Sequence, residues 1–176
     1  MYTIKTIDPN ILKDNSVIED INQRTTNIYF NINQITKNLE SIDNKKNVLK
    51  CLYNQNNQIC CLMIIGIDRC GVNDCFLESI ECAVIHQGYG KIMIDSLINS
   101  HEVLHWMCNP EMSTNLYDYY KRTYNFNEYT LSKNISCYKK TTTFFYKCDD
   151  VKKRKCLFDF YNTFSIKNYT FNLKCN

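Results

Sequence analysis

Residues 76–94 read FLESIECAVIHQGYGKIMI, and this stretch decides the fold. We predict a strand over Phe76–Ile85, then a glycine turn, then a helix that carries apolar residues on one face. The chain has only four glycines, and two of them, Gly88 and Gly90, lie at this junction. Their placement indicates that the backbone needs glycine where the strand gives way to the helix.

A strand followed by a glycine turn and a helix can bind a phosphate group. Free backbone N–H groups point at one place, and the helix N-terminus adds the positive end of its dipole. A dinucleotide-binding fingerprint is excluded, because Met93 stands where it needs a third glycine. A P-loop is excluded, because Ile92 rather than Ser or Thr follows Lys91. A turn with only a structural role is the alternative.

The remaining apolar pattern predicts strands and helices along a single α+β domain. Strands are predicted at Tyr2–Ile7, Val48–Tyr53, Ile59–Ile67, Val103–Cys108, Phe126–Leu131 and Ile135–Tyr146. Helices are predicted after Asp8-Pro9 through Val17, Ile18, Ile21 and Ile28, around Ile35–Ile42, and after Pro110 with Leu116, Tyr119, Tyr120 and Thr123 at helical spacing. The order along the chain is strand, two helices, three strands, helix, strand, helix and two strands.

The strand, turn and helix of residues 76–94 resemble the central motif of the GNAT superfamily of acetyltransferases, and are closest in look to its histone-acetyltransferase branch. That family has Arg/Gln-x-x-Gly-x-Gly/Ala before the helix, with paired apolar residues that Met93 and Ile94 match in spacing. Ile85 stands where the family has Arg or Gln. The resemblance implies an α+β fold with a central mixed, mostly antiparallel sheet of about six to seven strands flanked by helices.

Residues 113–126 resemble a second GNAT motif, an Asn-x-x-Ala-x-x-Phe/Tyr-Tyr helix that ends in Gly-Phe. Ser113 replaces the Asn, Leu116 replaces the Ala, and Asn125-Phe126 replaces Gly-Phe, with one extra residue after the tyrosine. Asn is the non-glycine residue that best accepts the left-handed conformation at a helix C-terminus. We therefore expect Asn125 to end this helix.

The resemblance ends near Tyr146, so residues 1–147 are predicted to form the acetyltransferase domain. Residues 148–176 are predicted to be a C-terminal extension, a helix and a strand, that packs on it. The extension contains the basic run Lys152–Lys155. An exposed helix face explains this run, and a nuclear-localisation signal is the alternative.

The resemblance implies an N-acetyltransferase that moves the acetyl group of acetyl-CoA, its cosubstrate, to a primary amine by direct attack in a ternary complex. It implies that the pyrophosphate is held by the Gly88-Tyr89-Gly90 turn. The residues expected to bind the cofactor are Ala83, Val84, Ile85, Gly88, Tyr89, Gly90 and Lys91. A catalytically inactive binding module with the same fold is the alternative, because Ile85 departs from the motif. The acceptor, a protein or a small molecule, is left open.

Three residues are catalytic candidates. The resemblance assigns Tyr120 as the proton donor to the departing CoA thiolate, with a core aromatic as the alternative. It assigns Glu78 as the base, whereas Glu81, an odd number of positions along the same strand, is expected on the opposite face. His105 is the second choice of base, because an ordinary histidine pKa of about 6.5 suits proton transfer.

Composition and charge limit the class of protein. A formal charge of +3 does not indicate a nucleic-acid or membrane partner, and the apolar runs are shorter than the roughly 20 residues of a membrane span. The odd number of cysteines, 11, and the absence of an apolar leader predict an intracellular, cytoplasmic protein with thiols acting as small buried hydrophobes. A monomer or a homodimer is expected. Cysteine and histidine spacing predicts no metal site.

Overall fold

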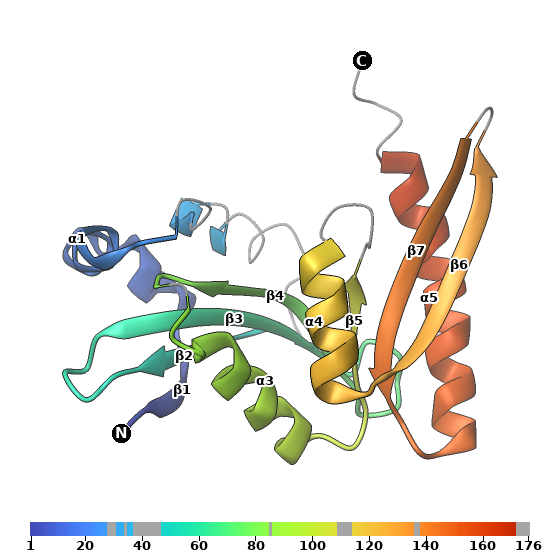
Figure 1. The fold of residues 1–176 in the computed structure, drawn as a ribbon, viewed down its shortest axis with the longest axis horizontal. Helices are drawn as coiled ribbons and strands as arrows, with labels where there is room; N and C mark the ends of the chain where they lie inside the picture. Colours follow the sequence, from blue (N-terminus) through green and yellow to red (C-terminus); the bar gives the residue numbers. More distant parts are fainter. Residues whose placement is uncertain are drawn as a thin grey trace. The chain divides into compact units, whose positions relative to one another are not determined.

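The computed structural model describes residues 1–27, 31–33, 35, 36, 47–84, 86–108, 114–135 and 138–171. The chain forms two compact units (Figure 1). Unit 1 comprises Met1–Arg69 and Cys75–His101, and unit 2 comprises Cys70–Asp74 and Glu102–Asn176. The described part contains seven strands, and every strand pair within each unit is antiparallel, as the predicted fold class requires.

Unit 1 contains a four-stranded antiparallel sheet in the order β1-β2-β3-β4. Its strands are β1 (Thr3–Ile7), β2 (Asn47–Tyr53), β3 (Ile59–Ile67) and β4 (Cys75–Cys82). The predicted hairpin of β2 and β3 is confirmed. Every residue of β3 except Ile67 is buried, so this strand is covered on both faces.

Helices cover the two faces of β3. The helix α1 (Asn15–Arg24) contributes Ile21 to a core cluster that includes Leu62 and Ile64 of β3. The helix α3 (Tyr89–Ser100) packs on β3 and β4 and buries Met93, Ile94 and Leu97, which confirms its predicted apolar face. Because strand residues alternate between faces, Leu62 and Ile64 point away from the side that Cys61 and Met63 occupy.

Polar side chains set where the N-terminal helices begin. Asp8 accepts a hydrogen bond from the backbone of Asn10 and starts the short 3-10 helix η1 (Pro9–Lys13), and Asp14 caps α1 by accepting from the backbone of Ser16 at 2.9 Å. The predicted break at Asp8-Pro9 is therefore confirmed. Ile28 and most of the predicted helix Ile35–Ile42 lie outside the described residues.

Unit 2 contains a three-stranded antiparallel sheet in the order β5-β7-β6. Its elements are β5 (Leu104–Cys108), α4 (Thr114–Tyr124), β6 (Asn127–Ile135), β7 (Tyr138–Lys147) and α5 (Val151–Phe171). Ile135 ends β6 instead of beginning β7, because it pairs with Tyr138 across the hairpin. Asn125 follows α4 with a φ of 48°, so the predicted left-handed end of this helix is confirmed.

The helix α5 packs on β6 and β7 through aromatic rings. Tyr161 stacks on Phe144 with ring centroids 4.1 Å apart, and Phe158 stacks on Tyr129 at 4.4 Å. The basic run lies in the first turns of α5, where Lys153 pairs with Glu102 at 3.2 Å, as an exposed helix face allows. The strand predicted near the C-terminus has no counterpart among the described residues, where α5 continues to Phe171.

Eight cysteines of the described part are free thiols. The prediction of buried thiols is confirmed for Cys51, Cys60, Cys61 and Cys75 and is wrong for Cys70 and Cys82, which are partly exposed. Cys148 is also buried, and Cys156 is exposed on α5. Among the described residues, the helices are too short or too polar to cross a bilayer.

Tyr161 tests how much α5 contributes to stability. Its side chain is fully buried, and its hydroxyl has no hydrogen-bond partner among the described residues. We expect Tyr161→Ala to lower the free energy of unfolding by about 3–5 kcal/mol in urea denaturation. Tyr161→Phe is the matched control and should change it by less than about 1 kcal/mol, because it keeps the ring and removes only an unpaired hydroxyl. Equal losses in both variants would contradict the packing role.

Candidate functional site

The segment after β4 is held by backbone hydrogen bonds. The strand ends at Cys82, three residues before the predicted end at Ile85, which lies outside the described residues. Ala83 is fully buried; its N–H donates to the carbonyl of Cys60 at 3.0 Å, and its carbonyl accepts from the backbone of Thr26 at 3.0 Å. The first bond extends the contact with β3 by one residue, because Cys60 belongs to β3, whereas the second takes the carbonyl of Ala83 to Thr26, outside the strand.

The two glycines of the turn have different roles. Gly88 is the residue that precedes α3, has a φ of 73° and gives the helix no side-chain cap. A left-handed φ favours glycine, so the predicted backbone requirement is confirmed there. Gly90 lies in the first turn of α3, and a Cβ atom added to it would meet the sulfur of Cys82 at 3.6 Å, an ordinary contact. The fold therefore leaves room for a side chain at Gly90 and does not itself explain the glycine.

Tyr89 and Lys91 flank Gly90. The ring of Tyr89 packs edge-on against Tyr2 at 5.4 Å, and burial together with a hydrogen bond to Tyr2 raises the pKa of Tyr89 to about 12. Lys91 is paired with Asp95 one turn along the helix. The N-terminus of α3 thus contacts Tyr2, the residue before β1, and the charge of Lys91 is paired with that of Asp95.

Glu78 lies at a bulge in β4. Leu77 pairs with Ile65 and Ser79 with Ile64, so Glu78 is the extra residue between them. Its carboxylate pairs with Arg69 at 2.9 Å. Burial raises the pKa of Glu78, and the neighbouring Arg69 partly opposes this.

Glu81 differs from Glu78 in its electrostatic partners. Burial alone raises the pKa of Glu81, with no cation opposing it. The prediction that the two carboxylates lie on opposite faces assumed strict alternation, and the bulge at Glu78 removes that basis. Sequence reasoning missed both the bulge and the pairing with Arg69, because both depend on how β4 meets β3.

Tyr120 is nearly buried, with 6% of its surface exposed. Its ring packs edge-on against Trp106 at 5.4 Å, among the other tyrosines of α4. The neighbouring Tyr119 is 38% exposed, so the apolar face of α4 is narrower than predicted. This geometry suits a core aromatic and leaves little of the side chain accessible. Glu78 and the glycine turn belong to unit 1, whereas Tyr120 and His105 belong to unit 2.

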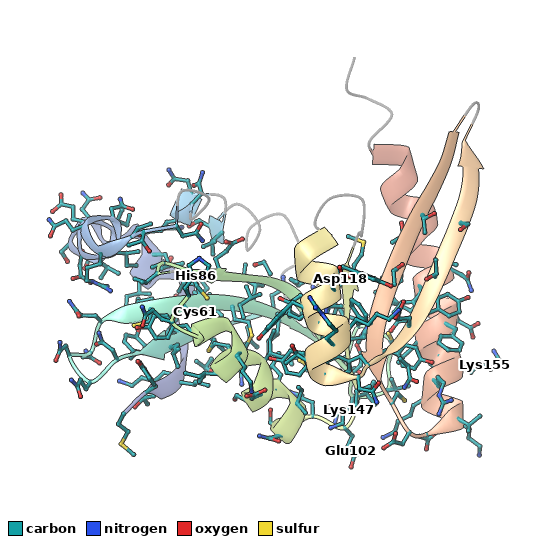
Figure 2. All side chains as sticks on the ribbon, viewed as in Figure 1. Cys61, His86, Glu102, Asp118, Lys147 and Lys155 are labelled. Atoms are coloured by element: carbon teal, nitrogen blue, oxygen red, sulfur yellow. The ribbon has the colours of Figure 1, made fainter. Side chains whose placement is uncertain are left out.

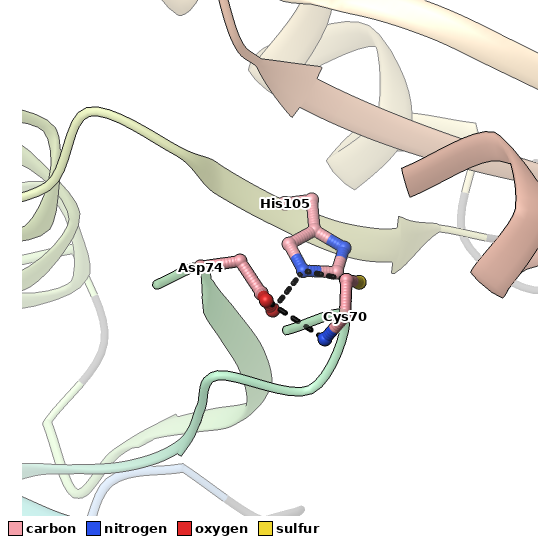
Figure 3. A group of neighbouring side chains, drawn as sticks. All are labelled: Cys70, Asp74 and His105. Atoms are coloured by element: carbon pink, nitrogen blue, oxygen red, sulfur yellow. Dashed lines mark hydrogen bonds and ion pairs between the residues drawn. The ribbon is translucent and has the colours of Figure 1, made fainter. Parts of the chain in front are cut away.

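His105 is fully buried in a polar cluster with Asp74 and Cys70, all within unit 2 (Figure 3). Its Nε2 lies 2.9 Å from Oδ2 of Asp74 and 4.0 Å from the sulfur of Cys70. The backbone N–H of Cys70 donates to Oδ1 of Asp74 at 2.8 Å. Burial lowers the pKa of His105, and Asp74 opposes this, so the neutral ring donates its Nε2 proton to the carboxylate.

This cluster offers three potential metal ligands, which lie within 4.8 Å of one another. A metal ion would have to displace the hydrogen bond that already pairs the two fully buried groups, His105 and Asp74. Because His105 has no exposed surface, it also has no access to an incoming amine in this arrangement. The contact of His105 with Asp74 and Cys70 was not predicted from the sequence, because neither residue lies near His105 along the chain.

The fold is that of the GNAT acetyltransferases, and the predicted fold class is confirmed. The ribosomal-protein-S18-alanine N-acetyltransferase from Escherichia coli superposes with a TM-score of 0.53 at 16% identity over 84% of this chain and 93% of that one. A GNAT-family acetyltransferase from Bacillus cereus superposes with a TM-score of 0.53 at 14% identity over 84% and 97%. Arabidopsis thaliana NAA60, solved in complex with acetyl-CoA, gives 0.52 at 11% identity over 83% and 97%.

Neither a family model nor a curated protein matches the sequence. The similarity is therefore one of fold. The sequence identities are too low to assign the acceptor substrates of those proteins to this chain.

The protonation of His105 is measurable by NMR. We expect its ring to stay neutral at pH values where an ordinary histidine, with a pKa of about 6.5, is half protonated. Because the folded pKa lies below the unfolded one, the stability that this group contributes is complete above about pH 6.5 and is lost as the pH falls. Asp74→Asn should lower the pKa further, because it removes the attracting carboxylate. A ring that protonates at or above about pH 6.5 would contradict this environment.

Proposed function

We propose that this protein is an acetyl-CoA-dependent N-acetyltransferase, in which a primary amine attacks the thioester directly in a ternary complex. The observation that carries the proposal is Gly90. This residue lacks a side chain although the protein leaves room for one, in the first turn of a helix that no side chain caps. Close approach of a ligand to the backbone explains a glycine at such a place. The likeness of fold to acetyltransferases names the ligand class.

The turn would bind the pyrophosphate of acetyl-CoA through backbone amides. We assign this contact to Gly88, Tyr89, Gly90 and Lys91, with Val84 and Ile85 leading into the turn and Ala83 anchoring them to β3. The dipole of α3 favours an anion at its N-terminus. Ile85 replaces the Arg or Gln of the family motif, but a backbone cradle does not need that side chain.

Tyr120 would donate a proton to the departing CoA thiolate, and Glu78 would accept the proton of the amine. Burial moves the pKa of Glu78 upward, toward the range in which a carboxylate is an effective general base. Glu81 is the alternative base. We keep His105 out of this role and assign it the hydrogen bond to Asp74 instead, because it is fully buried.

We further propose that residues 148–176 extend the acetyltransferase domain formed by residues 1–147. The superposed acetyltransferases match 83–84% of this chain, which leaves room for an addition.

The free thiols of the described part favour a reducing compartment, and we place the protein inside the cell, in the cytoplasm. The acceptor is a primary amine of a protein or a small molecule.

Gly90→Ala tests the cofactor turn. The added methyl group fits against Cys82 and favours the helix, so stability should stay equal or rise by up to about 1 kcal/mol. Affinity for acetyl-CoA, measured by calorimetry, should fall at least about tenfold, because the methyl group would occupy the space of the pyrophosphate. Gly71→Ala is the control: its φ of 73° should cost stability without loss of affinity. If the wild-type protein itself does not bind acetyl-CoA, the proposal of an enzyme is overturned in favour of the catalytically inactive binding module.

Tyr120→Phe and Glu78→Gln test the catalytic assignments. Each should lower kcat at least about tenfold with acetyl-CoA and an amine acceptor, because each removes one proton-transfer group. Glu81→Gln is the matched control and should keep kcat within about twofold, since it changes a neighbouring carboxylate of the same strand. A large loss in Glu81→Gln with none in Glu78→Gln would move the base to Glu81.

A further inference from the structure

Two cysteines face each other at the end of the β3–β4 ladder, beside the glycine turn. Cys61 of β3 and Cys82 of β4 are direct partners in the strand register. Their sulfur atoms are 3.2 Å apart. Both lie in unit 1, and Figure 2 labels Cys61 on its strand. This pair was unexpected, because the two residues are 21 positions apart and form no recognised cysteine motif.

The two thiols differ in accessibility. Cys61 has no exposed surface, whereas Cys82 is partly exposed. An oxidant from solvent can therefore reach Cys82, and Cys61 lies directly behind it. This is the arrangement of a reacting thiol and a resolving thiol.

The two thiols also differ in acidity. The contact between the sulfurs of Cys82 and Cys61 and the backbone N–H of Gly90 both lower the pKa of Cys82. Gly90 belongs to the first turn of α3, whose positive dipole end also favours a thiolate. The hydrogen bond to Cys82 and burial raise the pKa of Cys61. The partly exposed thiol is thus the more acidic of the pair.

The strand geometry permits a bond between them. Directly opposed residues in antiparallel strands have Cα atoms about 4.5–5.5 Å apart, within the range that a disulfide bridges. The sulfurs need to approach by roughly 1 Å more. No change of register between β3 and β4 is required.

We propose that Cys82 and Cys61 are a reversible redox pair that closes to a disulfide when a hydroperoxide oxidises the protein. The Cys82 thiolate attacks a peroxide oxygen, the O–O bond breaks, and the alcohol or water leaves with a proton, which gives Cys82 sulfenic acid. The sulfur of Cys61 then attacks that of Cys82. The S–S bond forms as the S–O bond breaks, and the hydroxide leaves as water with the proton of Cys61. A dithiol reductant reverses the reaction.

Closing the pair changes the first turn of α3. The disulfide removes the Cys82 thiol that accepts from Gly90, and so changes the contact of that N–H at the helix N-terminus. This inference does not depend on what the glycine turn binds. Its test is therefore a chemical one, independent of acetyl-CoA.

The experiment treats the full-length protein with hydrogen peroxide, blocks the remaining thiols and maps the cysteines by mass spectrometry. Trypsin cleaves after Lys50, Arg69 and Lys91, so Cys61 and Cys82 fall in the separate peptides 51–69 and 70–91. We expect these peptides to be joined by a Cys61–Cys82 bond, with the loss of two hydrogens, and to separate with dithiothreitol. Oxidation of other thiols without this bond would overturn the proposal.

Single variants assign the two roles. In Cys61→Ser, the sulfenic acid on Cys82 should persist and be trapped by dimedone, because no resolving thiol is present. In Cys82→Ser, Cys61 should stay reduced. Cys61→Ala replaces Cys61→Ser if the buried hydroxyl prevents folding. Cys51→Ser is the control, since Cys51 is buried in β2 and burial raises its pKa; the linked pair should form as in the wild type. Oxidation of Cys61 in Cys82→Ser would refute the assigned order of reaction.

Discussion

The left-handed conformation of Gly88 determines how the chain passes from β4 into α3, the junction that carries the proposed function. This residue lets the chain leave the sheet after β4 and enter α3 with its N-terminus uncapped by any side chain. The same reversal carries Met93, Ile94 and Leu97 into the core, so that α3 covers one face of β3. A side chain at Gly88 would strain the backbone in the loop on which both the packing of α3 and the proposed anion site depend. Structure and proposed chemistry therefore share one conformational requirement.

Local signals in the sequence were sufficient for the elements around this turn. Apolar periodicity predicted β2, β3 and α3, and the preference of Asn125 for positive φ predicted the end of α4. These features depend on neighbours a few residues away. The predicted end of β4 was too late, because the carbonyl of Ala83 bonds to Thr26 of a distant segment, while its N–H still donates to Cys60 of β3.

The site chemistry was harder to predict, because it depends on contacts that are distant along the chain. Arg69 reaches Glu78 only because β3 and β4 form a hairpin with a bulge, and Asp74 meets His105 through a loop 31 residues earlier. Motif resemblance assigned candidate roles to residues by position, but burial and pairing decide what each residue can do. The burial of His105 and the partial accessibility of Cys82, for example, cannot be predicted from the pattern of residues around them.

The aromatic stacking of α5 on β7 has a consequence for biosynthesis. Phe144 of β7 is fully buried, and it stacks directly on Tyr161, which the ribosome adds later. Until α5 has emerged, that strand presents bare aromatic surface to solvent. Nascent chains and prematurely terminated products would share this exposed face, and chaperones or proteases would act on it. The synthesis of α5 thus determines when this aromatic face of β7 is covered.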